Sequence, residues 1–301
     1  MISKYVISIL TAGILWGTMG LFSRTLGDFG FTPEELIIVR VGIAALLFLI
    51  QSLIRDRNSV RVKPGDFWCF IGSGIMSLMF FTYCYFNAIE MMTLSAAAIL
   101  LYTAPAIVML LSALLFKERV TENKVIALVL AIGGCALASG IAGGHLGMNT
   151  TGILYGLGSG LGYALYSIFA RFALNGGYSS PTINLYSCVL AAIGAAVVFR
   201  PGDFFTHVFQ SPSVTLLCFG AAVVTCFLPY AFYTYGLSGL ENGKASVIAS
   251  VEPVVASLIG VIIYNEHLDM SNIAGIVLVL AAIVLLNIDP KNKWIRKEKN
   301  N

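Results

Sequence analysis

The stretch KASVIASVEPVVASLIGVIIY, residues 244–264, decides how the chain folds. It is long enough to cross a lipid bilayer as a helix, yet Glu252 and Pro253 stand together near its middle. Lipid has no water to solvate a carboxylate or the carbonyl that a proline leaves without a donor, so protein or a wet cavity must surround the pair. A second stretch, residues 95–116, has Pro105 at the matching place. We therefore expect these two helices to line a central path.

The composition predicts a polytopic membrane protein whose surroundings are a lipid bilayer. Of 301 residues, 58% are hydrophobic and only 11% are charged, whereas a soluble domain carries about 25% charged residues. Apolar runs long enough to span a bilayer recur along nearly the whole length. The net charge of +3 gives no indication of nucleic acid as a partner.

The apolar runs predict an all-α fold with ten transmembrane helices. They lie near residues 5–26, 34–54, 67–88, 94–116, 124–142, 152–173, 181–200, 213–235, 244–264 and 272–289. Lys and Arg gather in the segments that share a side with the chain termini, as in the loop at 55–63 and the tail at 291–301. By the positive-inside rule, this pattern predicts a multi-pass protein of the cell membrane with both termini in the cytoplasm.

An internal repeat divides these helices into two groups of five. GILWGTMGLFSR at 13–24 aligns with GLGYALYSIFAR at 160–171, and residues 85–121 align without a gap with residues 233–269. Pro105 thereby matches Pro253. An odd number of helices in each half gives the halves opposite orientations, an architecture common among secondary transporters. We expect one repeat at 1–143, a second at 150–290 and a basic cytoplasmic tail at 291–301.

The ordered motifs resemble the EamA family of the drug/metabolite transporter superfamily. They are a W/Y-x5-F-x-R pattern in the first helix of each half, at Trp16 and Tyr163, and A-x-S…EP…GE near the end. The resemblance implies a carrier of small metabolites that works by alternating access, with helices one to four and six to nine around a cavity. Helices five and ten would be peripheral, at a homodimer contact. Ala104 departs from the symmetric pattern, because it stands where the second half has Glu252.

Glu252 is the one acid predicted to lie deep in a span. It could take up and release a proton, or bind a cationic group. The alternative is structural: a protonated Glu252 could cap a carbonyl that Pro253 frees, such as that of Ala249. Pro105 and Pro253 could likewise be hinges of a shared gate or kinks that serve packing.

Two basic residues are further candidates for substrate binding or gating. Arg40 lies inside the second predicted helix and keeps its charge, so it either recognises an anion or forms an ion pair with Glu34 or Glu35. Lys244 opens the ninth predicted helix, where it either meets substrate or extends to the membrane interface.

Aromatic residues recur in the helices that would face the path. Such walls suit amphipathic or ring-bearing solutes and, through the ring face, cations. Packing or interface anchoring is the alternative for each one. The candidates are Trp16, Tyr83, Tyr85, Tyr102, Tyr163, Tyr166, Tyr230 and Tyr233, with Asn87 as an added hydrogen-bonding group.

The remaining motifs argue against other classes of protein. SGLENGK at 238–244 lacks the first Gly and the final Ser/Thr of a phosphate-binding loop, and no Cys, His or acidic cluster has the spacing of metal ligands. We expect no cofactor, no metal, no enzymatic activity, and solvated histidines such as His207 in outer loops. The sequence therefore predicts a secondary transporter of small molecules, most simply an exporter. The alternatives are an importer or exchanger of amino acids, sugars or other metabolites, and a membrane-embedded lipid-modifying enzyme.

Overall fold

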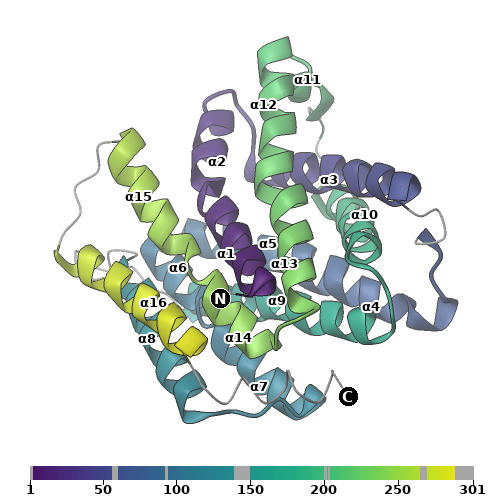
Figure 1. The fold of residues 1–301 in the computed structure, drawn as a ribbon. Helices are drawn as coiled ribbons and strands as arrows, with labels where there is room; N and C mark the ends of the chain where they lie inside the picture. The colour runs from purple at the N-terminus through teal and green to yellow at the C-terminus, as the bar shows by residue number, and fades with distance from the viewer. Residues whose placement is uncertain are drawn as a thin grey trace.

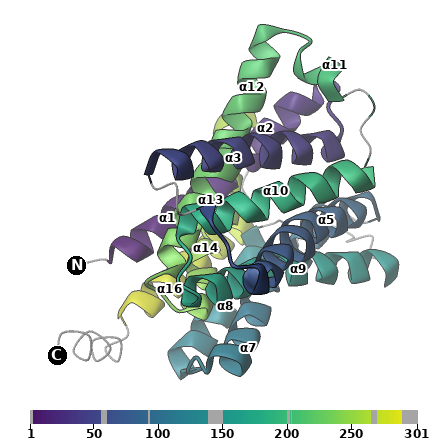
Figure 2. The same ribbon diagram turned by 90° about the vertical axis from the view of Figure 1, so that its right-hand side faces the viewer.

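A computed structural model describes residues 3–55, 60–91, 94–138, 150–199, 202, 204–264 and 270–288. All regular secondary structure in these ranges is helical (Figures 1 and 2). The helices are α1 (Lys4–Gly17), α2 (Met19–Gly27), α3 (Pro33–Arg55), α4 (Phe67–Ile71), α5 (Phe80–Met91), α6 (Leu94–Leu101), α7 (Ala104–Phe116), α8 (Glu122–Ala138), α9 (Thr150–Asn175), α10 (Ser180–Phe199), α11 (Phe204–Val208), α12 (Pro212–Ala222), α13 (Leu228–Leu237), α14 (Asn242–Ala249), α15 (Glu252–Tyr264) and α16 (Met270–Ile288). The predicted tail at 291–301 lies outside the described residues.

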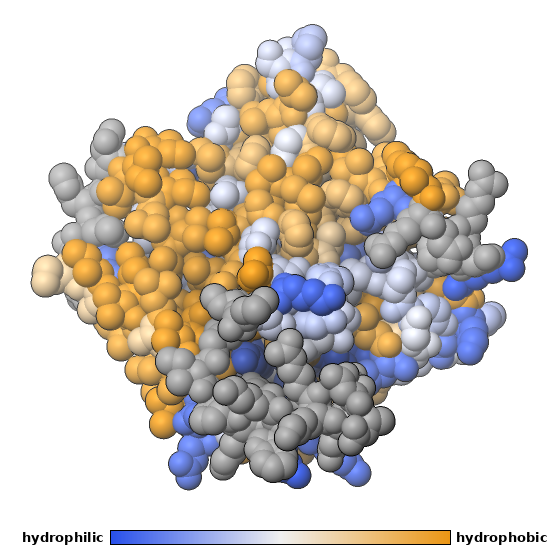
Figure 3. Space-filling view, in the orientation of Figure 1, coloured by the Kyte–Doolittle hydropathy of each residue, from blue (hydrophilic) through white to orange (hydrophobic). Residues whose placement is uncertain are grey.

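Within the described ranges, seven helical stretches are long and apolar enough to cross a membrane. They are Lys4–Gly27, Pro33–Ile54, Pro64–Tyr85, Thr150–Asn175, Ser180–Phe199, Pro212–Leu237 and Asn242–Tyr264, and the shorter apolar helices Ala104–Phe116 and Met270–Leu286 accompany them. Each of the ten predicted ranges contains helix, but the count of ten spans stays a prediction. Hydrophobic residues cover the surface over α12, α15 and α16 in Figure 3, where Leu216, Ile262 and Val277 are exposed.

Two helices are interrupted at repeat-related positions. α6 ends at Leu101 and α7 begins at Ala104, whereas α14 ends at Ala249 and α15 begins at Glu252. Pro105 and Pro253 each fall in the first turn of the helix after the break. A proline is tolerated there because the first N–H groups of a helix have no partner within it. Proline thus sets the place at which each helix restarts.

A second irregularity is a π-helical segment inside each of two predicted spans. One is η3 (Gly72–Met79), between α4 and α5, and the other is η5 (Val223–Phe227), between α12 and α13. π-helical turns widen the helix and disturb its regular hydrogen bonding, and they occur often at functional sites. η3 packs against α10 and η5 packs against α3, so both segments meet the second helix of the opposite half.

Several helix contacts recur when the two halves are exchanged. α1 packs on α13 as α9 packs on α5, while α3 packs on α10 and α8 on α16. Glycines allow the closest approaches. A Cβ atom on Gly13 would lie 2.9 Å from the Ala249 carbonyl oxygen, and one on Gly160 would lie 2.9 Å from the Leu100 carbonyl oxygen. The first helix of each half therefore packs against the interrupted helix of the opposite half.

Candidate functional site

Four aromatic side chains from three helices meet at the centre of the molecule. The ring of Trp16 on α1 lies 6.0 Å from that of Tyr163 on α9, measured between centroids. It lies 5.3 Å from Tyr230 and 5.2 Å from Tyr233, both on α13. All three ring contacts of Trp16 within this group are edge-on or tilted, the geometry that the ring quadrupoles favour. The two halves of the chain thus share one aromatic cluster, which we call the central cluster.

Tyr166 joins the central cluster and anchors it through buried hydrogen bonds. Its ring lies 4.8 Å from that of Tyr230. Its hydroxyl donates to Asn184 Oδ1 at 2.5 Å and meets Thr234 Oγ1 at 2.7 Å. The Tyr233 hydroxyl meets Ser167 Oγ at 2.7 Å. Since these polar groups have partners, the rings are held in fixed positions.

A small cavity lies within the central cluster. It is lined by Trp16, Ser77, Phe81, Tyr163, Tyr166, Ser167, Tyr230 and Tyr233. The cavity volume is about 10 Å³, which is room for about one water molecule. Pockets for organic ligands measure several hundred Å³. The described conformation is therefore closed around its centre, and a larger solute could enter only if the helices part.

Glu252 stands beside this cavity at the first position of α15. Its side chain is half-buried, and it interacts with the Tyr163 hydroxyl and with the charge of Arg40. Its charge also interacts electrostatically with Tyr85, Tyr102 and Cys135. A carboxylate at a helix N-terminus is also stabilised by the helix dipole. Glu252 therefore brings an ionisable group to the edge of an aromatic cavity.

The carbonyl that Pro253 leaves without its helical partner is that of Ala249. Gly13 packs directly against it: a Cβ atom there would lie 2.9 Å from the oxygen. The structure thus places α1 over the break, and it places the Glu252 carboxyl group toward Tyr163. Pro253 and Pro105 are both buried, next to the breaks that they begin.

Arg40 donates hydrogen bonds to a threonine. Its Nε donates to Thr225 Oγ1 and its Nη2 donates to the Thr225 carbonyl oxygen, both at 2.9 Å. Thr225 belongs to η5, whose disturbed hydrogen bonding makes a carbonyl available. Of the two alternatives for Arg40, the ion pair with Glu34 or Glu35 is not formed, because a long-range contact offers Arg40 two acceptors.

Glu35 has a different partner, and this corrects the expectation of a solvated His207. Nδ1 of His207 lies 3.0 Å from Glu35 Oε1, and Glu35 is only 3% exposed. His145 and His267 lie outside the described residues.

The other predicted residues divide into two groups. Tyr102 lies at the break between α6 and α7 and Lys244 is buried in the first turn of α14, so both belong to the interrupted helices. Tyr83 lies apart from the central cluster: it is 37% exposed and its ring is 6.0 Å from that of Tyr155. Asn87 donates to the Tyr83 carbonyl oxygen at 2.8 Å and is likewise not brought to the cluster.

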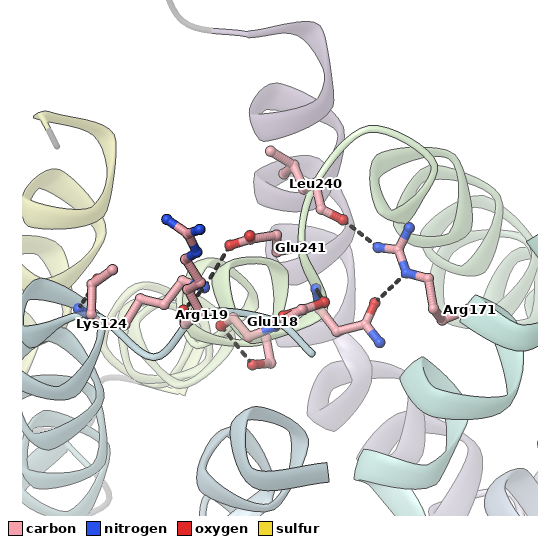
Figure 4. Close-up of polar contacts among 10 residues, drawn as sticks. Glu118, Arg119, Lys124, Arg171, Leu240 and Glu241 are labelled. Atoms are coloured by element: carbon pink, nitrogen blue, oxygen red, sulfur yellow. Dashed lines mark hydrogen bonds and ion pairs between the residues drawn. The ribbon is translucent and has the colours of Figure 1, made fainter. Parts of the chain in front are cut away.

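A polar network at the N-terminus of α14 was not predicted from the sequence (Figure 4). Glu118 Oε1 accepts from the backbone N–H of Asn242 at 2.8 Å, and its Oε2 accepts from that of Gly243 at 3.2 Å. Arg171 donates from Nε to Asn242 Oδ1 at 2.9 Å and also donates to the Leu240 carbonyl oxygen. Neither Glu118 nor Arg171 is among the candidate residues from the sequence. Their places in the two aligned repeat segments were the available signal.

A salt bridge extends the same network. Lys124 Nζ lies 2.5 Å from Glu241 Oε2 and donates to the Arg119 carbonyl oxygen at 2.7 Å. No metal site accompanies it: within the described ranges, no three His, Cys, Asp or Glu side chains gather to hold a metal ion.

Two repeat-related halves that share a central cavity, each with one interrupted helix, are typical of one class of membrane protein, the secondary transporters built from repeats. Comparison with known proteins makes this specific. The chain belongs to the EamA-like transporter family, whose model matches residues 3–140 and 150–288. This confirms the resemblance inferred from the motifs.

Individual relatives match along nearly their whole length. An uncharacterized transporter of Archaeoglobus fulgidus is 26% identical over 284 residues, covering 92% of this chain and 94% of that protein. The uncharacterized transporter YwfM of Bacillus subtilis is 22% identical over 290 residues, covering 96% and 95%. A solved crystal structure is similar in fold, with a TM-score of 0.81 at 18% identity, over 97% of this chain and 99% of that one.

Proposed function

We propose that the protein is a secondary transporter that moves small metabolites or amphipathic compounds across the cell membrane, most simply outward. The observation that carries the proposal is the central cluster, in which Trp16 of the first half meets Tyr163, Tyr230 and Tyr233 of the second, beside the ionisable Glu252. A site shared between two repeat-related halves is accessible from either side when the halves move.

The proposed topology has ten spans in two inverted halves, with both termini in the cytoplasm. The seven long stretches supply seven of them. The interrupted pair α6–α7, α8 and α16 supply the other three. The homodimer contact implied for helices five and ten stays a prediction. It is supported by α8 and α16, which pack on each other and expose apolar side chains such as Val129 and Val277.

The proposed transport cycle alternates the two interrupted helices. Solute enters the central cluster when the helices part at one end, the halves rock, and the α6–α7 and α14–α15 pairs exchange which mouth is open. The breaks before Pro105 and Pro253 allow the two parts of each pair to tilt separately. Gly13 and Gly160 have no side chains to resist sliding of α1 and α9 over these breaks.

Glu252 makes the cycle asymmetric, because Ala104 stands at the related place in the first half. We propose that Glu252 responds to protonation or to the charge of the solute. Glu252→Gln keeps the size and removes the charge, so it should flatten the pH profile of transport. Full transport with an unchanged pH profile in Glu252→Gln would exclude this role. The exposed Glu122 provides the matched control, Glu122→Gln.

The proposal as a whole is tested by a ligand screen on the purified protein. Thermal unfolding is measured with amino acids, amines, nucleobases, sugars and cationic drugs, and each stabilising compound is then offered to proteoliposomes as a transport substrate. We expect at least one compound to raise the unfolding midpoint of the wild type and to lose this effect in Trp16→Ala. Compounds that stabilise Trp16→Ala as strongly as the wild type would place binding away from the central cluster and contradict the proposal.

A further inference from the structure

The polar network at the N-terminus of α14 joins parts of the chain that a transporter must separate. Glu118 and Lys124 flank the connection between α7 and α8 in the first half, and Arg171 is on α9. Their partners are Leu240, Glu241, Asn242 and Gly243, at the start of α14. We call these contacts the α14 lock. Figure 4 shows Glu118 and Arg171 reaching toward the α14 terminus from its two sides.

The α14 lock supplies hydrogen-bond acceptors that the first turn of α14 does not find within its own helix. The first N–H groups of any helix have no partner within it, and Glu241, the residue before α14, makes no side-chain capping bond. Glu118 accepts from two of these groups although it lies in the connection between α7 and α8. Charge-assisted hydrogen bonds to a helix N-terminus are strong. The start of α14 is thus fastened to the end of α7 as long as Glu118 is charged and in place.

Repeat-related arginines differ in their surroundings, which sets one end of the molecule apart from the other. The repeat aligns Arg171 with Arg24. Arg171 is part of the α14 lock, whereas Arg24 is exposed and lies over the ring of Tyr264, 4.5 Å from its centroid. The same motif thus has different contacts in the two halves. Alternating access requires such an asymmetry between the two ends of the transport path.

A continuous line of contacts connects the α14 lock to the central cluster. Asn242, which Arg171 holds, donates from Nδ2 to the Ser167 carbonyl oxygen at 3.3 Å. The Ser167 hydroxyl in turn meets the Tyr233 hydroxyl at 2.7 Å. Ser167 and Tyr233 both line the cavity. A solute that moves Tyr233 therefore acts on a residue that touches the lock.

We propose that the α14 lock is the gate at that end of the transport path, and that Asn242 and Ser167 couple its state to the central cluster. In the proposed topology this gate faces the cytoplasm. The inference rests on the proposed function for its purpose, but its test needs no substrate. Glu118 and Arg171 are gating residues, and Asn242 is a positioning residue that acts through Ser167.

The gate is tested by the accessibility of the cavity. Ser77 lines the cavity and is 1% exposed, so labelling of Ser77→Cys reports when a thiol reagent reaches the centre. The protein carrying Ser77→Cys is treated with a membrane-impermeant maleimide in vesicles of either orientation. Labelling is counted above the background of the six native cysteines, all of which are buried.

We expect Glu118→Gln to raise the rate of labelling from the α14 side by roughly tenfold, since it removes a charged acceptor from two hydrogen bonds. The matched control is Glu122→Gln, an exposed acid nearby, which should leave the rate unchanged. Unchanged labelling in Glu118→Gln overturns the gate. An equal rise from both sides also overturns it, because that result indicates general loosening.

A charge exchange guards against variants that fold poorly. Lys124→Glu places two carboxylates where the 2.5 Å salt bridge stood and should raise labelling from the α14 side. Adding Glu241→Lys restores opposite charges and should return labelling toward the wild-type rate. Absence of rescue overturns the assignment of this pair to the gate.

The coupling is tested with a double-mutant cycle. Tyr233→Phe removes only the hydroxyl that meets Ser167, and should raise labelling by a few fold, whereas Tyr83→Phe on the exposed face should not. The combination of Tyr233→Phe with Glu118→Gln should be non-additive, because coupled residues share one interaction. Strict additivity overturns the coupling. If the gate variants respond but no solute is carried, the gate stands and the proposed transport function fails.

Discussion

Gly17 is the position at which a single methyl group should disturb the site most. It lies on α1 where that helix crosses the start of α15. A Cβ atom there would lie 2.6 Å from Val255 Cβ and 2.8 Å from the Glu252 carbonyl oxygen. Neither atom is the tip of a flexible side chain. Gly17→Ala can therefore be accommodated only if α15, and Glu252 with it, moves away from α1.

The size of the effect follows from this geometry. To increase the distance between the new Cβ atom and Val255 Cβ from 2.6 Å to an ordinary contact of about 3.4 Å, the two helices must move apart by roughly 0.8 Å. Overpacking of this kind destabilises by about 1–3 kcal/mol. For a chain of this length, that loss lowers the unfolding midpoint by about 2–10 °C.

The assay is thermal unfolding of purified protein in detergent, with Gly20→Ala as the matched control. Gly20 is on the next turn of the same span, and a Cβ atom there would meet nothing within 4 Å. Gly20→Ala should stabilise slightly, by about 0.5–1 kcal/mol, because alanine favours helix. The two substitutions should thus have opposite signs. An equal rise in midpoint for both variants would refute the close approach of α1 to α15.

Three other substitutions have expected outcomes. Tyr166→Phe removes a hydroxyl with two buried hydrogen bonds, so it should lower the free energy of unfolding by about 1–3 kcal/mol. Chemical unfolding measures this change, and an unchanged midpoint would show that the hydroxyl contributes nothing. Arg40→Lys cannot reach both acceptors of Thr225 with one ammonium group, so it should slow transport in a vesicle flux assay, and wild-type rates would contradict this. Trp16→Phe should weaken binding of any compound found in the thermal screen. Trp68→Phe, at an exposed ring, is the control and should leave binding unchanged. An equal loss of affinity in both variants would argue against binding at the central cluster.

The interruptions of the two central helices were predictable from the sequence because proline has a fixed stereochemical effect. Pro105 and Pro253 cannot donate a backbone hydrogen bond, and the internal alignment placed them at equivalent positions. The structure breaks both helices just before them. The proximity of Trp16 and Tyr163 could also be inferred from the sequence, because the repeat gives these residues the same place in their respective halves.

Long-range partners were not predictable in the same way. One of the two alternatives paired Arg40 with its nearest acids along the chain, but Thr225 in η5 supplies its hydrogen-bond acceptors. No local pattern marks η5 as π-helical. Glu118 follows the end of an apolar run, yet it caps a helix that begins more than 120 residues later. Such contacts depend on how whole helices cross, which the sequence pattern of one helix does not contain.

The most direct test of transport through the central cluster is a flux measurement in proteoliposomes across an imposed pH gradient. The solute is the compound that most stabilises the wild-type protein in the thermal screen. We expect saturable, gradient-dependent flux for the wild type, no flux for Trp16→Ala, and flux that no longer follows the gradient for Glu252→Gln. Gradient-dependent flux of equal size in all three proteins would contradict the account.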